Sequence, residues 1–138
     1  MPRVNTPCTH LTVNDKRYFI YPEKRQCCYC CNSTEGCGIL RQDWLADGHY
    51  QGTDQLDGKT FDKWEKKGLT EDYWWVTTDD EHIPRKLQEA ESKYTDYRVE
   101  SFVKKPLPDS VFALPDYCNK NCPFTSICGR FRERLSAE

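Results

Sequence analysis

Residues 26–38 read QCCYCCNSTEGCG and hold five of the nine cysteines of this 138-residue chain. The residues before them, KRYFIYPEKR, combine aromatic and β-branched side chains with a proline turn, so residues 16–21 and 27–31 are predicted to form a β-hairpin. Successive side chains on a strand point to opposite faces. One face is therefore expected to carry Cys27, Tyr29 and Cys31, and the other Cys28 and Cys30.

Strand geometry restricts how these cysteines pair. Same-face neighbours lie roughly 6–7 Å apart at Cα, beyond the usual disulfide separation, and adjacent side chains point apart. The four clustered cysteines should therefore form disulfides with the remaining ones, which are Cys8, Cys37, Cys118, Cys122 and Cys128. We expect three or four disulfides, a C-terminal tail held to the sheet by at least two of them, and one cysteine that is unpaired or bonded to another chain.

The same stretch also fits metal or redox chemistry. Cys27 with Cys30, and Cys28 with Cys31, have the spacing of zinc ligand pairs and of catalytic dithiols. Cysteine density and the lack of a nearby histidine favour a disulfide framework, with no metal and no cofactor. Such a framework predicts secretion or another oxidising extracytoplasmic or lumenal compartment, and a zinc or thiol-redox protein is the alternative.

Size and charge limit the remaining classes. The length fits one domain, expected to comprise a leader (residues 1–15), an antiparallel β domain (16–105) and a Pro-rich arm with a Cys-rich helix packed on the sheet (106–138). A net charge of −2 and a pI near 5.9 provide no broad basic surface, so no nucleic acid is expected. No apolar run suggests a membrane span. The start, MPRVNTPCTH, lacks a signal peptide, so we expect that processing or truncation has removed one.

Further strands are readable along the chain. Asp57-Gly58 suits a type I′ turn between strands at residues 50–56 and 59–66, and three more strands are expected within 69–78, 83–92 and 94–103. Ile39, Leu40, Trp44 and Leu45 are expected in a buried turn or short helix. The fold predicted is mainly β: a curved, half-barrel-like antiparallel sheet of about five to seven strands with a short C-terminal amphipathic helix, cross-linked by disulfides.

That helix is predicted from residues 121–135, NCPFTSICGRFRERL. Pro123 suits its first turn, and the apolar residues recur at helical spacing, at Phe124, Ile127, Cys128, Phe131 and Leu135. Gly129 is expected to weaken it.

Few residues suggest catalysis. His10, His49 and His82 lie in no known catalytic pattern, so no catalytic residue is assigned and a non-enzymatic protein is expected. Asp79, Asp80 and Glu81 read as a solvated turn rather than a calcium site. Asn32-Ser33-Thr34 is an N-glycosylation sequon, and Asn32 is the expected acceptor of a glycan.

Aromatic residues supply the candidate binding surface. Trp74 and Trp75 should face opposite sides of one strand, so that one fills the core while the other is covered, lines a pocket or contacts a partner. The candidate ligand or partner contacts are Tyr29, Trp64, Tyr73, Trp74 and Trp75. Core packing is the alternative role for the whole group.

The order of motifs resembles a known group of proteins. A cysteine-rich strand is followed by GCGILRQDWLADGHYQGTDQLDGKTFDKWEKKGL, then YWW, then VFALPDYC, a series similar to uncharacterised secreted cysteine-containing proteins of plants, algae and other protists, over about residues 16–118. More distantly it is similar to ependymin-related and lipoprotein-carrier half-barrels, which partly enclose apolar ligands.

This resemblance has two implications for the fold. It places Trp64 and residues 73–75 in the sheet, with Trp44 covering one end. Family members carry extra strands before the part corresponding to Lys16, where this chain has only a short leader, so either a smaller sheet or an open sheet edge is expected.

These observations lead to one hypothesis and one principal rival. The first is a non-enzymatic, extracytoplasmic, disulfide-rich binding protein that holds an apolar or glycan ligand on a concave aromatic face. The rival is a structural or interaction subunit of a larger extracellular or lumenal assembly, which docks a protein partner through the open sheet edge.

Overall fold

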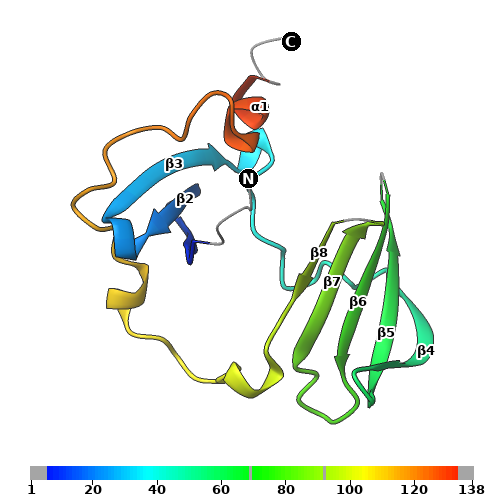
Figure 1. Cartoon of the computed structure of the whole chain (residues 1–138). Coiled ribbons are helices and arrows are strands. Elements are labelled where there is room, and N and C mark those ends of the chain that lie inside the picture. Colours follow the sequence, from blue (N-terminus) through cyan, green and yellow to red (C-terminus); the bar gives the residue numbers. More distant parts are fainter. Residues whose placement is uncertain (1–5, 69, 92, 134–138) are drawn as a thin grey trace. The chain divides into compact units, whose positions relative to one another are not determined.

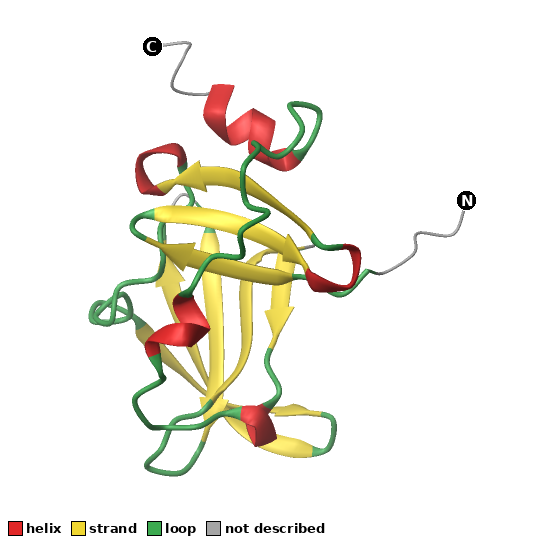
Figure 2. Cartoon of the chain, turned by 90° about the vertical axis from the view of Figure 1, so that its left-hand side faces the viewer, coloured by secondary structure: helices red, strands yellow, loops and turns green. Residues whose placement is uncertain are grey.

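The computed structural model describes residues 6–68, 70–91 and 93–133, and this part of the chain is mainly β (Figure 2). Its eight strands form two antiparallel sheets, one of three strands and one of five, accompanied by 3-10 turns and a short C-terminal α-helix. The chain divides into two compact units. The first comprises Met1–Leu40 and Pro106–Glu138, and the second comprises Arg41–Lys105.

The first unit contains the three-stranded sheet, in the order β1-β2-β3. Its strands are β1 (Thr9–Val13), β2 (Lys16–Tyr21) and β3 (Gln26–Asn32), so the predicted hairpin is confirmed. The expectation of a leader over residues 1–15 is wrong, because β1 lies within it and pairs with β2. Asn14 and Asp15, both at positive φ (51° and 64°), make the tight turn that joins them. The expected open edge beside Lys16 is therefore covered by β1.

The 3-10 turns mark where the chain changes direction. In the first unit they are η1 (Pro22–Lys24), η2 (Ser33–Glu35) and η4 (Asp109–Phe112). η2 is held by a capping box. The Asn32 side-chain oxygen accepts from the backbone amide of Glu35, and the Glu35 carboxylate accepts from the backbone amide of Asn32.

The C-terminal segment lies along β3. Tyr29 donates its amide to Lys120 (2.9 Å) and accepts from the Cys122 amide (2.8 Å), a parallel bridge that pairs part of the β3 edge. The helix α1 (Ile127–Glu133) begins later than predicted, because a turn from Pro123 to Ser126 precedes it. Figure 2 shows this segment passing the three strands before it enters α1.

Only part of the predicted apolar face of α1 is buried. Cys128 is buried and Phe131 packs on the cysteine cluster, whereas Phe124 and Ile127 are exposed (64% and 52%). Leu135 lies outside the described residues. Gly129 is required rather than merely tolerated: a Cβ there would lie 1.9 Å from the Phe124 carbonyl oxygen, so only glycine permits this approach.

Cystines form the core of the first unit. Strand β3 carries one end of each of four disulfides, Cys27–Cys118, Cys28–Cys122, Cys30–Cys128 and Cys31–Cys37. Cys8 is an exposed free cysteine. The pairing is outward from the strand, as predicted.

The predicted face of one cysteine on β3 is wrong. Cys27 packs with Leu11 and Ile20, whereas Cys31 joins Cys28 and Cys30 in the other cluster. The cause is a β-bulge: Arg17 pairs with Cys31 and Tyr18 with Tyr29, so Cys30 is an extra residue that breaks the alternation.

The second unit is a five-stranded meander in the order β4-β5-β6-β7-β8 (Figure 1). Its strands are β4 (His49–Leu56), β5 (Lys59–Lys67), β6 (Glu71–Thr77), β7 (Pro84–Ala90) and β8 (Lys93–Asp96). Asp57 and Gly58 adopt the positive φ predicted for their turn (52° and 76°). β8 is shorter than expected, because the chain turns away into η3 (Val99–Ser101).

The antiparallel pairing, mainly β class, short C-terminal helix and disulfides are confirmed, but one continuous sheet over residues 16–105 is not found. Residues 33–48 contain only the η2 turn and non-strand segments, so no described pairing joins β3 to β4. Ile39 and Leu40, expected to be buried, are exposed (71% and 50%) at the end of the first unit. Among the described residues, no helix has the length and hydropathy of a membrane-spanning segment.

Arg132 provides a test of the packing of α1. Its guanidinium donates to the carbonyl oxygens of Tyr29 (3.2 Å), Cys30 (2.6 Å) and Cys122 (2.7 Å). Arg132→Gln should lower the free energy of unfolding by about 1–3 kcal/mol, because it deprives partly buried carbonyls of their donors. The control is Arg130→Gln, an exposed position on the same helix. Denaturant unfolding with disulfides intact measures both, and equal stabilities of the two variants would contradict this role.

Candidate ligand-binding site on the five-stranded sheet

The strand register gives the second unit's sheet two chemically different faces. Directly paired residues share a face, so the row Tyr50–Trp64–Trp74–Leu87 lies on one side, here called the tryptophan face. The row Lys63–Trp75–Lys86 lies on the other side, here called the lysine face. The prediction that Trp74 and Trp75 face opposite sides is confirmed by these contacts.

Aromatic rings pack edge to face over the tryptophan face. The Trp44 ring centroid lies 5.6 Å from that of Trp74 at an interplanar angle of 85°, and Tyr97 contacts the same indole at 5.8 Å. Tyr50 lies 5.2 Å from Trp64 at a tilted interplanar angle of 49°. The edge-to-face geometries around Trp74 are ones that aromatic quadrupoles favour, so Trp44, Trp74 and Tyr97 hold one another in place.

A hollow of about 250 Å³ opens on this face. Its lining is Leu45, Trp64, Trp74, Val76 and His82. Two indoles and two aliphatic side chains form an apolar wall, and the imidazole is its polar group. His82 is exposed and has a φ of 48°, in the turn between β6 and β7. A small, mostly apolar hollow with one polar group has the composition of a small-molecule site.

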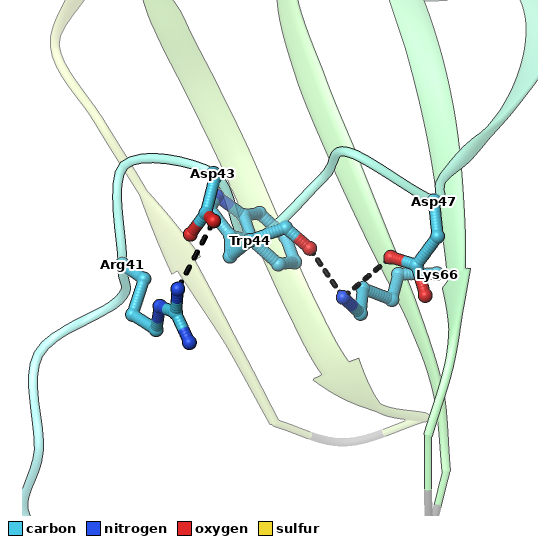
Figure 3. Close-up of polar contacts among 5 residues, drawn as sticks. All are labelled: Arg41, Asp43, Trp44, Asp47 and Lys66. Atoms are coloured by element: carbon cyan, nitrogen blue, oxygen red, sulfur yellow. Dashed lines mark hydrogen bonds and ion pairs between the residues drawn. The ribbon is translucent and has the colours of Figure 1, made fainter.

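One loop, residues 41–48, crosses the tryptophan face and supplies Trp44 and Leu45 (Figure 3). The Lys66 ammonium of β5 donates to the Trp44 carbonyl oxygen (2.5 Å) and to Asp47 Oδ1 (2.7 Å). The Lys66 hydrogen bond holds the pKa of Asp47 below its ordinary value. Lys66 therefore ties this loop to the sheet.

Sequence reasoning did not identify the Lys66 contact. The available signal was strand alternation, which puts Lys66 on the same face as Trp64. The loop's approach to that face has no such local signal, because it depends on tertiary packing.

The five predicted contacts do not form one surface, so the expected single aromatic face is wrong. Trp64 and Trp74 line the hollow, whereas Tyr73 and Trp75 lie on the lysine face. Trp75 is only 4% exposed and donates its indole N–H to Asp54 Oδ2 (3.1 Å), so it has a core role.

Tyr29 belongs to the first unit, on β3. Its hydroxyl donates to Glu35 Oε1 (2.9 Å). Burial, followed by this hydrogen bond and the Glu35 charge, raises the pKa of Tyr29 to about 12. Its ring lies beside Tyr18, at a centroid distance of 5.8 Å, and beside Lys16.

The first unit has larger hollows with different linings. One of about 410 Å³ is bounded by two cystines with Phe19, Tyr21 and two lysines. Another, of about 590 Å³, is mainly polar and is lined by Tyr29 among others. Neither contains a tryptophan, so the pair of indoles in the second unit remains the better candidate for a ring-stacking site.

The cysteine chemistry considered for residues 27–31 has a defined location. The sulfur atoms of Cys30, Cys31 and Cys37 all lie within 4.8 Å of one another, close enough to share a metal ion. All three are in disulfides, and a disulfide sulfur lacks the thiolate charge that zinc binding requires. The arrangement as it stands is structural.

The remaining candidates are dispersed. His10 stacks on Phe19 at 4.4 Å, and burial, with a contribution from Arg17, lowers its pKa. His49 lies on β4, away from His10 in the sequence and in a different unit. The Asn32 amide oxygen accepts from the Glu35 amide and the Thr34 hydroxyl (3.1 and 2.7 Å), so the sequon sits at the start of η2.

Comparisons with known proteins identify a family without a known activity. The chain matches the family described as Domain of unknown function (DUF8395) over residues 5–118. Searches of curated proteins and of solved structures found no match. The match ends at Cys118, so the partners of two β3 cysteines, Cys122 and Cys128, lie beyond it. The chain belongs to the DUF8395 family.

The role of Lys66 can be tested directly. In Lys66→Gln the pKa of Asp47 should rise towards its ordinary value, and exchange of the Gly48 amide, which bonds to the Leu45 carbonyl (2.8 Å), should accelerate. In the wild type the same loosening should appear as pH falls through the lowered pKa, because a protonated Asp47 no longer pairs with the ammonium.

NMR titration of the carboxyl group and amide hydrogen exchange supply these measurements. Lys67→Gln, one residue further along β5, is the matched control. An unchanged Asp47 pKa in Lys66→Gln would disprove the tether.

Proposed function

We propose that this chain is a non-enzymatic extracytoplasmic binding protein, and that the hollow on the tryptophan face holds a small apolar group or a sugar ring. The observation that supports this best is the pairing of Trp64 and Trp74 in an open hollow of about 250 Å³. Indoles offer flat apolar surface with few rotatable bonds, so they bind a ring at low entropic cost.

The dimensions of the hollow indicate the size of the ligand. Pockets for drug-sized molecules span about 300–1,000 Å³, so this hollow suits one ring or a short aliphatic chain. Leu45 and Val76 provide apolar contacts, and the exposed His82 imidazole can donate or accept one hydrogen bond. A sugar ring uses both properties, because it has an apolar face and hydroxyls at its edge.

The disulfides support the proposed location. Four disulfides and a buried cystine core are compatible with an oxidising compartment such as the extracellular space. In such a compartment Asn32 is the proposed glycan acceptor. Its side-chain oxygen Oδ1 accepts hydrogen bonds within the η2 turn, and no hydrogen bond from its side-chain nitrogen Nδ2 occurs among the described residues.

One observation favours the docking alternative. β1, β4 and β8 each pair with a single strand, and all four residues of β8 are exposed. An outer strand with unpaired backbone groups can add a strand from another chain. Docking through β8 would make the protein a subunit of a larger assembly rather than a carrier.

Ligand titrations monitored by tryptophan fluorescence and NMR test the proposal. The probes are a panel of neutral monosaccharides and a series of short-chain alcohols. We expect one class to bind, and Trp64→Leu and His82→Asn to weaken it at least about tenfold, roughly 1.4 kcal/mol. Asn is chosen at position 82 because it tolerates positive φ.

The control for this test is Tyr94→Ser, an exposed position on the lysine face. Folding of each variant is checked by thermal unfolding. Binding of neither class, or equal affinity in all variants, would refute the proposed site. Concentration-dependent association abolished by a proline in β8 would instead support docking.

A further inference from the structure

We infer that the lysine face of the second unit is a separate site for an acidic glycan, bound through Lys63 and Lys86. This inference is independent of the hollow on the tryptophan face. The two lysines come from β5 and β7 and flank Trp75 of the intervening strand, β6. Figure 1 shows these strands side by side.

The two ammonium groups lie over aromatic rings. Both lie 5.2 Å from the Trp75 ring centroid, and Lys63 is 4.4 Å from the ring of Tyr73. Lys86 is 4.8 Å from the ring of Tyr94. Each contact positions the cation over a ring but does not neutralise its charge.

Neither lysine forms an ion pair among the described residues. In the same unit Lys66 pairs with Asp47, Lys93 with Glu89, and Arg85 with Asp57 and Asp96, whereas Lys63 and Lys86 contact aromatic rings instead. Two partly exposed ammonium groups on one sheet face, neither of them in an ion pair, favour an anionic ligand between them.

Acidic residues define where on this face the anion binds. Tyr73 donates its hydroxyl to Glu71 Oε2 (3.0 Å), and this hydrogen bond, followed by burial and the charges of Glu71 and Glu65, raises the pKa of Tyr73. Asp54, which accepts from the Trp75 indole, and Asp96, which pairs directly with Lys86, also lie on this face. Glu65, Tyr73 and Tyr94 lie in one cross-strand row next to the row of the two lysines, so a negative group is expected directly between Lys63 and Lys86, with the exposed Tyr94 ring (57%) beside Lys86.

The aromatic rings favour an acidic sugar over an acidic peptide. A sugar ring can pack its apolar face on Tyr94 while its carboxylate or sulfate meets the ammonium groups. Lys63 and Lys86 lie on strands two spacings apart, about 9–10 Å, so a polymer with repeated acidic groups can engage both. Such a ligand gains affinity from two contacts at once.

Matched pairs of polymers test the inference and separate its two possible charged groups. Polygalacturonate is compared with its neutral methyl ester for carboxylates, and dextran sulfate with dextran for sulfates, by affinity electrophoresis at low and physiological salt. We expect at least one acidic polymer to bind and its neutral counterpart not to bind. Binding should weaken with salt, because exposed charges are screened.

Lysine variants locate the site. Lys63→Gln with Lys86→Gln should weaken binding at least tenfold, whereas the double arginine variant should retain it. Lys67→Gln with Lys93→Gln removes the same charge from exposed positions of the same sheet and should change binding less than twofold. Trp64→Leu should leave polymer binding unchanged, which separates this site from the hollow on the opposite face.

Three results would overturn the inference. If neither acidic polymer binds, acidic glycans are excluded as ligands. Equal losses of binding in the Lys63/Lys86 and Lys67/Lys93 variants would show that binding depends on net charge and not on a site. Polyglutamate binding with the same dependence on Lys63 and Lys86, and at equal affinity, would identify an acidic peptide instead.

Discussion

Four disulfides on one seven-residue strand, β3, are the constraint on which the first unit depends. Three of them join residues 91, 94 and 98 positions apart. On the chain-entropy account, closing a loop of that length stabilises a protein by about 4–5 kcal/mol, although nested loops do not add independently. Among the described residues, the largest fully buried side chains are all cysteines, Cys27, Cys30, Cys31 and Cys128. A unit with so small an apolar core needs such cross-links.

In the sequence, the second unit lies inside the loops that the three long-range disulfides close. Its sequence, Arg41–Lys105, enters after Cys37 and returns before Cys118, so the long cystine loops enclose it in the chain. A meander built on local hairpins forms its own sheet without needing distant partners. That sheet then presents two faces from one set of strands. Alternation places an apolar tryptophan row on one face and two lysines around Trp75 on the other.

Much of this fold is predictable from local patterns. The Asp57-Gly58 turn, the β2–β3 hairpin and the outward pairing of the cysteines follow from turn chemistry and strand geometry. The side of the sheet on which Cys31 lies is not predictable in this way, because the bulge at Cys30 depends on how β3 pairs with β2. The division into two sheets also escapes local reasoning, since periodicity identifies strands but not which of them pair.

The candidate site shows the same division. Alternation separates Trp74 from Trp75 correctly, yet it cannot show that Tyr29 lies in another unit or that residues 41–48 cross the tryptophan face. Those features arise from tertiary packing. Cation–aromatic contacts at Lys63 and Lys86 likewise require the register of three strands.

The count of free thiols tests the central claim most directly. Native chain is denatured with a metal chelator, alkylated with and without prior reduction, and weighed by intact mass spectrometry, with peptide mapping of the labelled residue. The four disulfides predict one alkylated cysteine without reduction, at Cys8, and nine after it. Nine labelled cysteines without reduction would contradict the cystine core, and would make the clustered sulfurs of Cys30, Cys31 and Cys37 candidates for metal binding.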